Sequence, residues 1–242
     1  MAPDTASAEL AVIGTVRGGF DDRFGTPRQP GLAPSAVAEL MLHPPHDQAE
    51  ALRGLETCSH VWLLFLFHCT AAQGWRPTVR PPRLGGNRRI GVFASRSPFR
   101  PNPVGLSVVE LEGLILAPGR CGLRFRNHDL VDGTPVIDIK PYLPWSDALP
   151  EARPPAGFEA PPANALQVVF SEQAERACLD AERAGVPLAD LVSELLSQDP
   201  RPAYRRQQSD RWHGMLIRGR DVRWTVEGGI ARVVEIRPPG AP

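Results

Sequence analysis

The sequence predicts a mainly β protein of the α+β class, with an N-terminal β-barrel and a small C-terminal α+β domain. Apolar side chains alternate with polar ones in short runs that Gly and Pro clusters bound, which is the pattern of strands. Gly and Pro together make 22 + 27 = 49 of 242 residues, which disfavours long helices. The glycine-rich dinucleotide and P-loop fingerprints are both missing, so a Rossmann fold is not expected.

The first half of the chain supplies the strands of the predicted barrel. One segment of this half, residues 48–56, reads instead as a short helix. The strand runs are too closely spaced for β-α-β units and favour a closed or strongly curved sheet. They cover residues 9–17, 60–68, 89–96, 104–116, 122–125 and 136–140.

A proline-rich stretch divides the chain. Residues 141–162 contain seven prolines, which neither continue a helix nor enter a central strand. We therefore expect a barrel domain over residues 1–145, a linker over 146–164 that packs loosely, and a C-terminal domain over 165–242.

The C-terminal domain is predicted to combine two helices with three strands. A strand over residues 165–170 precedes Ser171, whose hydroxyl suits the N-cap of a helix of about a dozen residues. A second helix over residues 188–198 ends before Asp199-Pro200, because the residue before proline is pushed out of the α region. The last two strands, residues 222–227 and 230–236, form a hairpin across a Gly-Gly turn.

Composition excludes several classes of protein. The four cysteines form no C-x-x-C pair, which favours reduced thiols and a cytoplasmic location over a zinc or disulfide scaffold. The N-terminus lacks the basic and apolar regions of a secretory signal, and the longest apolar run, residues 61–67, is too short to span a bilayer. His43 and His46 lie in a proline-rich loop without a metal-ligand motif, so no metal site is predicted.

The charge distribution points to a local anion site in a chain with equal numbers of basic and acidic residues. Residues 57–109 contain no Asp or Glu and seven arginines, of which five lie in a Pro- and Gly-rich loop over residues 76–89. Such a loop attracts phosphates, carboxylates or an RNA backbone, although an ordinary solvated face remains the alternative.

A second basic stretch lies at residues 200–224. It contains seven arginines and only two acidic residues, and the aromatic residue Tyr204 lies between arginines in the sequence. Two basic regions suit an extended anion such as tRNA better than a small metabolite, although a solvated loop is an equally good reading of the second one. The candidate RNA contacts are Arg83, Arg88, Arg89, Arg201, Tyr204, Arg205 and Arg206.

Three loops carry rigid polar groups next to predicted strands, at residues 24–31, 95–103 and 129–135. Their prolines and glycines fix the backbone, and such loops are where a sheet or barrel presents a ligand site. Taken singly, each loop is also explained as a structural turn.

Together these segments resemble the TsaA-like family, the TrmO-type tRNA methyltransferases. The resemblance covers most of the chain in order. It is carried by PRQPGL (27–32), RGLE-x-x-SHVWLLFLFH (53–68), GWRPTVRPPRLGGN (74–87), GVFASRSPFRPNPVG (91–105), DLVDGTPVIDIKPYLP (129–144) and QDPRPAY (198–204).

The resemblance implies a homodimeric β-barrel enzyme that uses S-adenosylmethionine to methylate N6 of threonylcarbamoyladenosine beside the anticodon of tRNA, at position 37. It also implies the residues that contact the methyl donor. These are Pro27, Arg28, Gln29, His68, Cys69, Arg96, Leu106, Asp132, Gly133, Thr134 and Pro135.

The residue that accepts the proton of the methylated nitrogen is not fixed by the resemblance. Asp138 and Lys140, the single lysine of the chain, are tentative candidates, and a structural ion pair between them is the alternative. Two further readings of the whole protein stay open: a non-catalytic module that binds nucleotide or tRNA, and a methyltransferase for small molecules.

Overall fold

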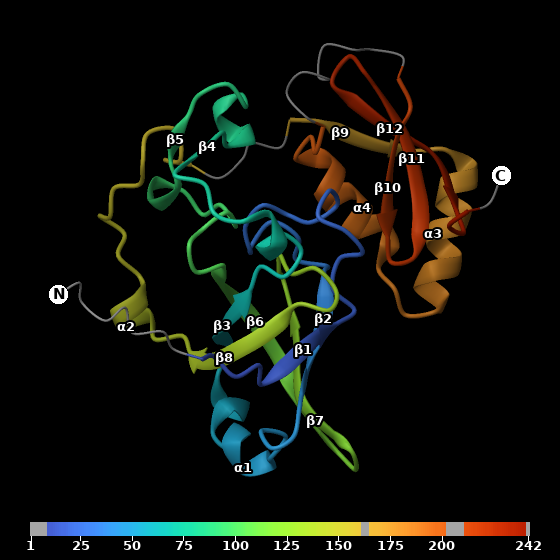
Figure 1. Ribbon diagram of the computed structural model, residues 1–242. Helices are drawn as coiled ribbons and strands as arrows, with labels where there is room; N and C mark the ends of the chain where they lie inside the picture. Colours follow the sequence, from blue (N-terminus) through green and yellow to red (C-terminus); the bar gives the residue numbers. More distant parts are fainter. Residues whose placement is uncertain (1–8, 161–164, 202–210, 241–242) are drawn as a thin grey trace.

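The computed structural model describes residues 9–160, 165–201 and 211–240 of the chain. Its N-terminal half is a closed barrel of six antiparallel strands in the order β1-β2-β7-β6-β3-β8 (Figure 1). The barrel closes because β8 pairs with both β3 and β1, which confirms the predicted β-barrel and excludes a Rossmann fold. The strands are β1 (Gly14–Arg17), β2 (Val37–Leu42), β3 (His60–Leu66), β6 (Val104–Ala117), β7 (Arg120–Arg126) and β8 (Pro135–Pro141).

Short elements decorate the barrel. The predicted helix over residues 48–56 is one α-helical turn, α1 (Ala49–Leu52), followed by a 3₁₀ turn (Leu55–Thr57), because Gly54 between them adopts a φ of 97°. A two-stranded ribbon, β4 (Thr78–Val79) with β5 (Ile90–Gly91), carries the arginine-rich loop. The proline-rich stretch includes one further helical turn, α2 (Pro144–Asp147).

The C-terminal part is a four-stranded sheet with two helices, in the strand order β10-β11-β12-β9. Ser171 caps the first helix, where its Oγ accepts a hydrogen bond of 3.2 Å from the Ala174 amide, as the sequence predicts. Strand β9 runs parallel to β12, and the other pairs are antiparallel. The elements are β9 (Gln167–Phe170), α3 (Glu172–Arg183), α4 (Leu188–Ser197), β10 (His213–Ile217), β11 (Arg220–Glu227) and β12 (Ile230–Arg237).

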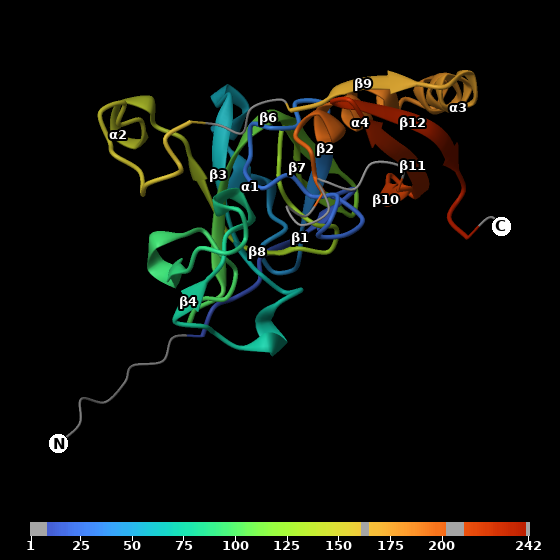
Figure 2. The same cartoon turned by 90° about the horizontal axis from the view of Figure 1, so that it is seen from above.

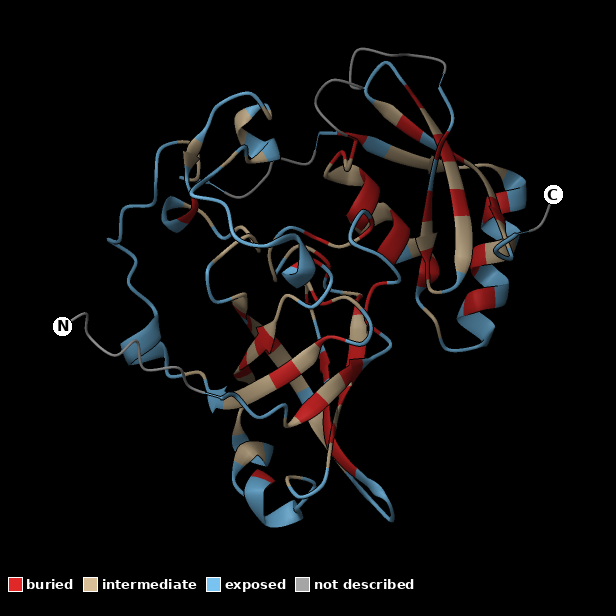
Figure 3. Ribbon diagram, viewed as in Figure 1, coloured by how far each residue is buried: buried red, intermediate tan, exposed pale blue. Residues whose placement is uncertain are grey.

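The molecule has two apolar cores, one inside the barrel and one between the C-terminal sheet and its helices (Figure 3). Phe20, Ala33 and Ala36 come from the N-terminal half of the chain but belong to the C-terminal core. All three lie in the connection between β1 and β2, residues 18–36, called here the β1–β2 segment. Figure 2 shows the C-terminal sheet beside the barrel, with α4 on the side that faces it.

Several elements differ from expectation. The run at residues 89–96 is a strand only at β5 and then forms a 3₁₀ turn (Val92–Ala94). The carbonyl oxygens of Val92 and Ser95 accept hydrogen bonds from Nη1 of Arg100, where a longer strand would need backbone amides of a neighbouring strand. Strands β2, β4 and β10 and the helical turn α2 were not predicted. Among the described residues, no helix combines the length and apolar character needed to cross a bilayer.

Candidate active site at one end of the barrel

The topology brings the predicted donor segments to one end of the barrel. The antiparallel register pairs Leu66 of β3 with Val104 of β6, and Thr15 of β1 with Pro135 of β8. The C-terminal ends of β1 and β3 therefore lie at the same rim as the N-terminal ends of β6 and β8. Four loops start or end at this rim, and they contain residues 27–29, 68–69, 96 and 132–135.

Arg96 joins two of these loops. Its Nη1 atom donates a hydrogen bond of 2.6 Å to Oε1 of Gln29, and both side chains are at least partly accessible to solvent. Gln29 in turn donates from Nε2 to the Arg28 carbonyl. Pro27 is buried beneath them, so the loop backbone is fixed while its polar groups face outward.

The turn at residues 132–135 is held by backbone hydrogen bonds to β1. Gly133 donates to the Val16 carbonyl and Val16 donates to the Thr134 carbonyl, each at 3.0 Å. Thr134 Oγ1 donates to the Val131 carbonyl at 2.6 Å, so this hydroxyl is already committed. Gly133 has a φ of 75°, a conformation that favours glycine, and its missing side chain leaves open space above the turn.

Asp129 is a carboxylate at the same rim that the sequence did not single out. Oδ1 of Asp129 accepts a hydrogen bond of 2.6 Å from Oγ of Ser107, whose side chain points into the barrel. Burial raises the pKa of Asp129 to about 6, while the Ser107 hydrogen bond and the positive charge of Arg96 oppose the rise. Asp129 is therefore a carboxyl group poised near neutral pH beside Arg96.

His68 and Cys69 lie two and three residues after the end of β3 and are both exposed, with 3.2 Å between Cys69 Sγ and His68 Nε2. Leu106 lies on the outer wall of the barrel, where it pairs with Leu64 of β3 and is 51% exposed. Its side chain points away from the barrel interior, opposite to that of its neighbour Ser107.

Asp138 and Lys140 do not lie at this rim. They form an exposed ion pair of 2.9 Å, and Lys140 pairs with Trp62 near the opposite end of β3. Lys140 lies five positions after Pro135, a distance of about 17 Å along a strand. The structure therefore favours the structural ion pair that the sequence left open. Asp138 and the predicted donor contact Leu106 both pair with Leu64 of β3, so Asp138 lies level with one donor contact, whereas Lys140 lies farther along β8 from the rim.

Two candidate RNA contacts are occupied by interactions within the chain. Arg83 donates to the carbonyls of Gly157 and Ala160 and lies 5.6 Å from the Phe158 ring, so it anchors the proline-rich stretch to the arginine-rich loop. Arg201 is buried and donates to both carboxylate oxygens of Asp199, at 2.7 and 3.1 Å. Arg201 therefore does not face solvent, which argues against its predicted contact with RNA, whereas Arg83 is exposed and its contact with RNA stays a prediction.

The other candidate RNA contacts divide into two groups. Arg88 and Arg89 are exposed in the arginine-rich loop, as expected. Tyr204, Arg205 and Arg206 lie outside the described residues.

Comparison with known proteins identifies the family. The family model for the tRNA-methyltransferase O N-terminal domain matches residues 15–148, and the model for the TrmO C-terminal domain matches residues 163–239. The chain is 46% identical over 234 residues to the tRNA (adenine(37)-N6)-methyltransferase of Escherichia coli K12, covering 96% of this chain and 99% of that protein.

Two further relatives agree. A putative S-adenosylmethionine-dependent methyltransferase of Pseudomonas aeruginosa PAO1 is 50% identical over 216 residues, covering 89% of this chain and 91% of that protein. A crystal structure of TrmO from Pseudomonas aeruginosa superposes with a TM-score of 0.80 at 40% identity, covering 96% of this chain and 99% of that one. The chain therefore belongs to the tRNA-methyltransferase O (TrmO) family.

Proposed function

We propose that this protein transfers the methyl group of S-adenosylmethionine to N6 of adenine 37 in tRNA. Family membership and the names of the relatives support this reaction. The observation that carries it for this chain is the meeting of four polar loops at one rim of the barrel, where Arg96 bonds to Gln29 across two of them.

The groups at the rim suit the chemistry of S-adenosylmethionine. We assign its carboxylate to Arg96, because a guanidinium binds a carboxylate through two parallel hydrogen bonds. The Asp132 carboxylate is exposed and suits a ribose hydroxyl or the ammonium group of the donor. The open space above Gly133 allows a ligand to approach the backbone closely. We retain all the donor contacts that the resemblance implies as part of this proposal.

Bound S-adenosylmethionine supplies a sulfonium-linked methyl group that is transferred in line to a nucleophile. The chain contributes alignment, because stiff loops hold both partners with little entropy left to lose. As the bond from N6 to the methyl carbon forms, the bond from that carbon to sulfur breaks and N6 loses its proton. We assign acceptance of that proton to Asp129, whose carboxylate lies at the rim beside Arg96.

This role predicts a specific pH dependence. Methyl transfer by the wild type should decline as the pH falls through about 6, because protonated Asp129 no longer accepts a proton. Ser107→Ala removes a hydrogen bond that lowers the pKa of Asp129, so the decline should move to higher pH. Asp129→Asn should reduce kcat by about 100-fold or more and abolish this pH dependence.

The measurement is the initial rate of methyl transfer between pH 5 and 8, with donor affinity determined in parallel by calorimetry. The positive charge of Arg96 acts on the Asp129 carboxyl group and lowers its pKa, so Arg96 is left unchanged in these variants. If Asp129→Asn has the same rate as the wild type and the same decline at low pH, Asp129 does not take part in the mechanism.

The arginine-rich loop and its flanks form a surface suited to RNA. Trp75 and Phe93 are 55% and 73% exposed, and the guanidinium of Arg100 lies 5.6 Å from the Phe93 ring. Exposed rings among cations offer both stacking and phosphate binding. The acid-free sequence at residues 57–109 leaves no carboxylate there to repel a phosphate.

Replacing both Arg88 and Arg89 by Ala should therefore weaken tRNA binding about tenfold at physiological salt and reduce the slope of log affinity against log salt by about 1 to 2. Filter binding at several salt concentrations measures both quantities. Arg124→Ala and Arg126→Ala, on the outer barrel wall in ion pairs with Glu112 and Glu110, are the matched control. A double variant that binds like the wild type would exclude this loop from the RNA surface.

The proposal also includes the nature of the acceptor, the location, the oligomeric state and the domain boundaries. The acceptor adenosine carries the threonylcarbamoyl group, the enzyme acts in the cytoplasm, and it forms a homodimer. The outer wall of β3 and β6, where Leu106 is 51% exposed among half-buried apolar side chains, supports an interface with a second copy. The division into residues 1–145, 146–164 and 165–242 is kept, with the β1–β2 segment packed on the last part.

The proposal is tested by incubating the protein with methyl-labelled S-adenosylmethionine and tRNA with or without threonylcarbamoyladenosine. Label should appear at N6 of adenine 37 only in the modified tRNA. Donor binding without transfer to any tRNA would favour a binding module, and transfer to small acceptors in the absence of tRNA would favour a small-molecule methyltransferase.

A further inference from the structure

We propose that the C-terminal part completes the methyl-donor site, with Arg218 as the positioning residue that holds the β1–β2 segment in place. This inference rests on the proposed function, because it takes residues 27–29 and 132–135 as donor contacts.

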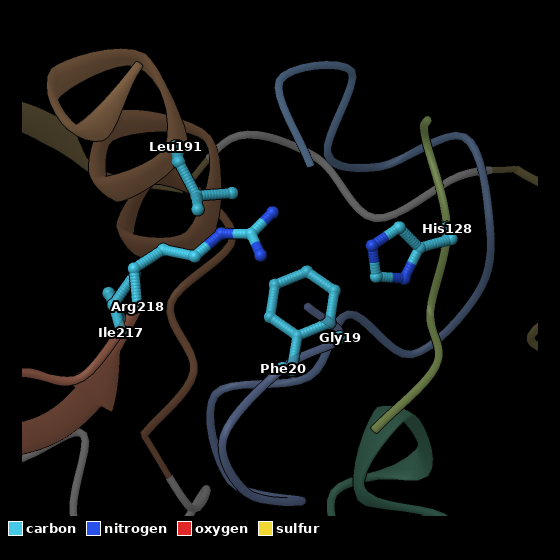
Figure 4. A pocket seen from close by; sticks show the side chains of 6 residues that line it. All are labelled: Gly19, Phe20, His128, Leu191, Ile217 and Arg218. Atoms are coloured by element: carbon cyan, nitrogen blue, oxygen red, sulfur yellow. The ribbon is translucent and has the colours of Figure 1, made fainter. Parts of the chain in front are cut away.

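Arg218 bonds to both ends of the β1–β2 segment. It lies in the turn between β10 and β11, where its φ of 51° aims the side chain toward the barrel. One guanidinium nitrogen, Nη1, donates to the Gly18 carbonyl, and the other, Nη2, donates to the Val37 carbonyl. Figure 4 shows this side chain reaching toward Phe20 and His128. A single arginine thus fixes the distance between the points where the segment leaves β1 and enters β2.

Helix α4 holds the second half of the segment. Gln198, just after the helix, donates from Nε2 to the Leu32 carbonyl at 2.7 Å. Glu194 accepts hydrogen bonds from the Ser35 amide at 3.0 Å and from the Ser35 hydroxyl at 2.8 Å. On the other side of residues 27–29, the Gly219 amide donates to the Asp21 carboxylate at 3.2 Å. The proposed donor contacts therefore lie between two anchored stretches.

The same segment is bonded to the turn at residues 132–135. Phe20 donates to the Leu130 carbonyl at 3.0 Å, and the Asp132 amide donates to the Phe20 carbonyl at 2.9 Å. The Gly19 amide donates to Oδ1 of Asp132 at 3.3 Å. Both groups of proposed donor contacts are thus attached to the backbone that Arg218 holds.

The charges around Arg218 fit a positioning role. Burial lowers the pKa of the Arg218 guanidinium, and the carboxylates of Asp21 and Asp132 oppose this change. Burial, with a smaller effect from Arg218, lowers the pKa of His128 to about 3, so the imidazole is neutral and does not repel the guanidinium. The Arg218 guanidinium thus lies close to two carboxylates and a neutral imidazole, and Asp132 is near enough to interact with it electrostatically.

The test compares Arg218→Gln with Arg232→Gln, which removes an exposed arginine from β12. Calorimetry with S-adenosylmethionine should show about tenfold weaker binding for Arg218→Gln and no change for the control, an effect typical of losing a hydrogen bond to a charged group. Hydrogen exchange of the ligand-free protein should be faster over residues 18–37 and 130–134 and unchanged in β3 and β6. Arg218→Lys keeps the positive charge but lacks the planar guanidinium, so its affinity for S-adenosylmethionine should lie between those of the wild type and Arg218→Gln.

Wild-type affinity and wild-type exchange in Arg218→Gln would overturn the inference. If this variant fails to fold, Gln198→Ala decides in its place, with a loss of affinity of a few-fold expected and unchanged affinity contradicting the inference. Absence of S-adenosylmethionine binding by the wild type would instead refute the proposed function, while the exchange data would still test whether Arg218 orders the segment.

Discussion

Arg96→Ala is expected to reduce kcat/KM for tRNA methylation by at least about 100-fold and to weaken donor binding to a similar extent. The guanidinium is the cation at the rim that we assign to the donor carboxylate, and the loss of a charge-assisted pair leaves that carboxylate without its counter-charge. The hydrogen bond of 2.6 Å to Gln29 is lost as well, so the loop that carries Pro27 and Arg28 is less well fixed. Calorimetry and steady-state kinetics measure the two effects.

The fold should survive this change. Arg96 is exposed, and removing an exposed charged side chain alters the free energy of unfolding by about 1 kcal/mol or less. Arg120→Ala is the matched control, because Arg120 begins β7 at the far end of the β6–β7 hairpin and its pair with Glu39 is exposed. Full activity in Arg96→Ala would show that the donor does not bind at this rim.

Gly19→Ala is expected to impair both stability and donor binding. A Cβ at position 19 would lie 2.6 Å from the Asp132 amide nitrogen and 2.8 Å from the Leu130 carbonyl oxygen. Both neighbours are backbone atoms of the segment that precedes β8, so relief requires the two segments to separate. We expect the free energy of unfolding to fall by roughly 2 to 3 kcal/mol and donor affinity to fall by at least about tenfold.

Gly113→Ala separates this steric effect from the general effect of replacing glycine. Gly113 lies in β6 with nothing within 4 Å of an added Cβ, and its φ is outside the left-handed region. The free energy of unfolding and the donor affinity of Gly113→Ala should stay close to those of the wild type. Denaturant unfolding and calorimetry measure these two quantities. Equal behaviour of the Gly19 and Gly113 variants would contradict the close packing of the two segments.

The sequence predicted most strands because a barrel wall with one buried face requires alternation. Strand β2 was missed because Val37–Leu42 consists largely of helix-forming residues, although every second side chain is buried. Strand β10 was missed because it is short and lies beside a stretch rich in arginine. Local propensity does not reveal the neighbouring strands that stabilise these segments.

The loops of the candidate site were recognisable from their rigid, polar composition, but their partners were not. Gln198 belongs to the QDPRPAY motif that carries part of the family resemblance, yet its side chain bonds to a carbonyl 166 positions earlier. Arg218 carries no local signal, and Asp129 was recognisable only as part of the polar loop at residues 129–135, because the roles of both arise from burial and from partners distant in sequence. Such contacts depend on how the two cores meet, which spacing alone does not determine.

The position of the methyl donor is the central claim, and a crystal structure with bound S-adenosylhomocysteine tests it most directly. The account predicts this product at the rim where β1, β3, β6 and β8 meet the four loops, with its carboxylate on Arg96 and its nucleoside against residues 132–135. Electron density for the product at any other place on the chain would contradict it.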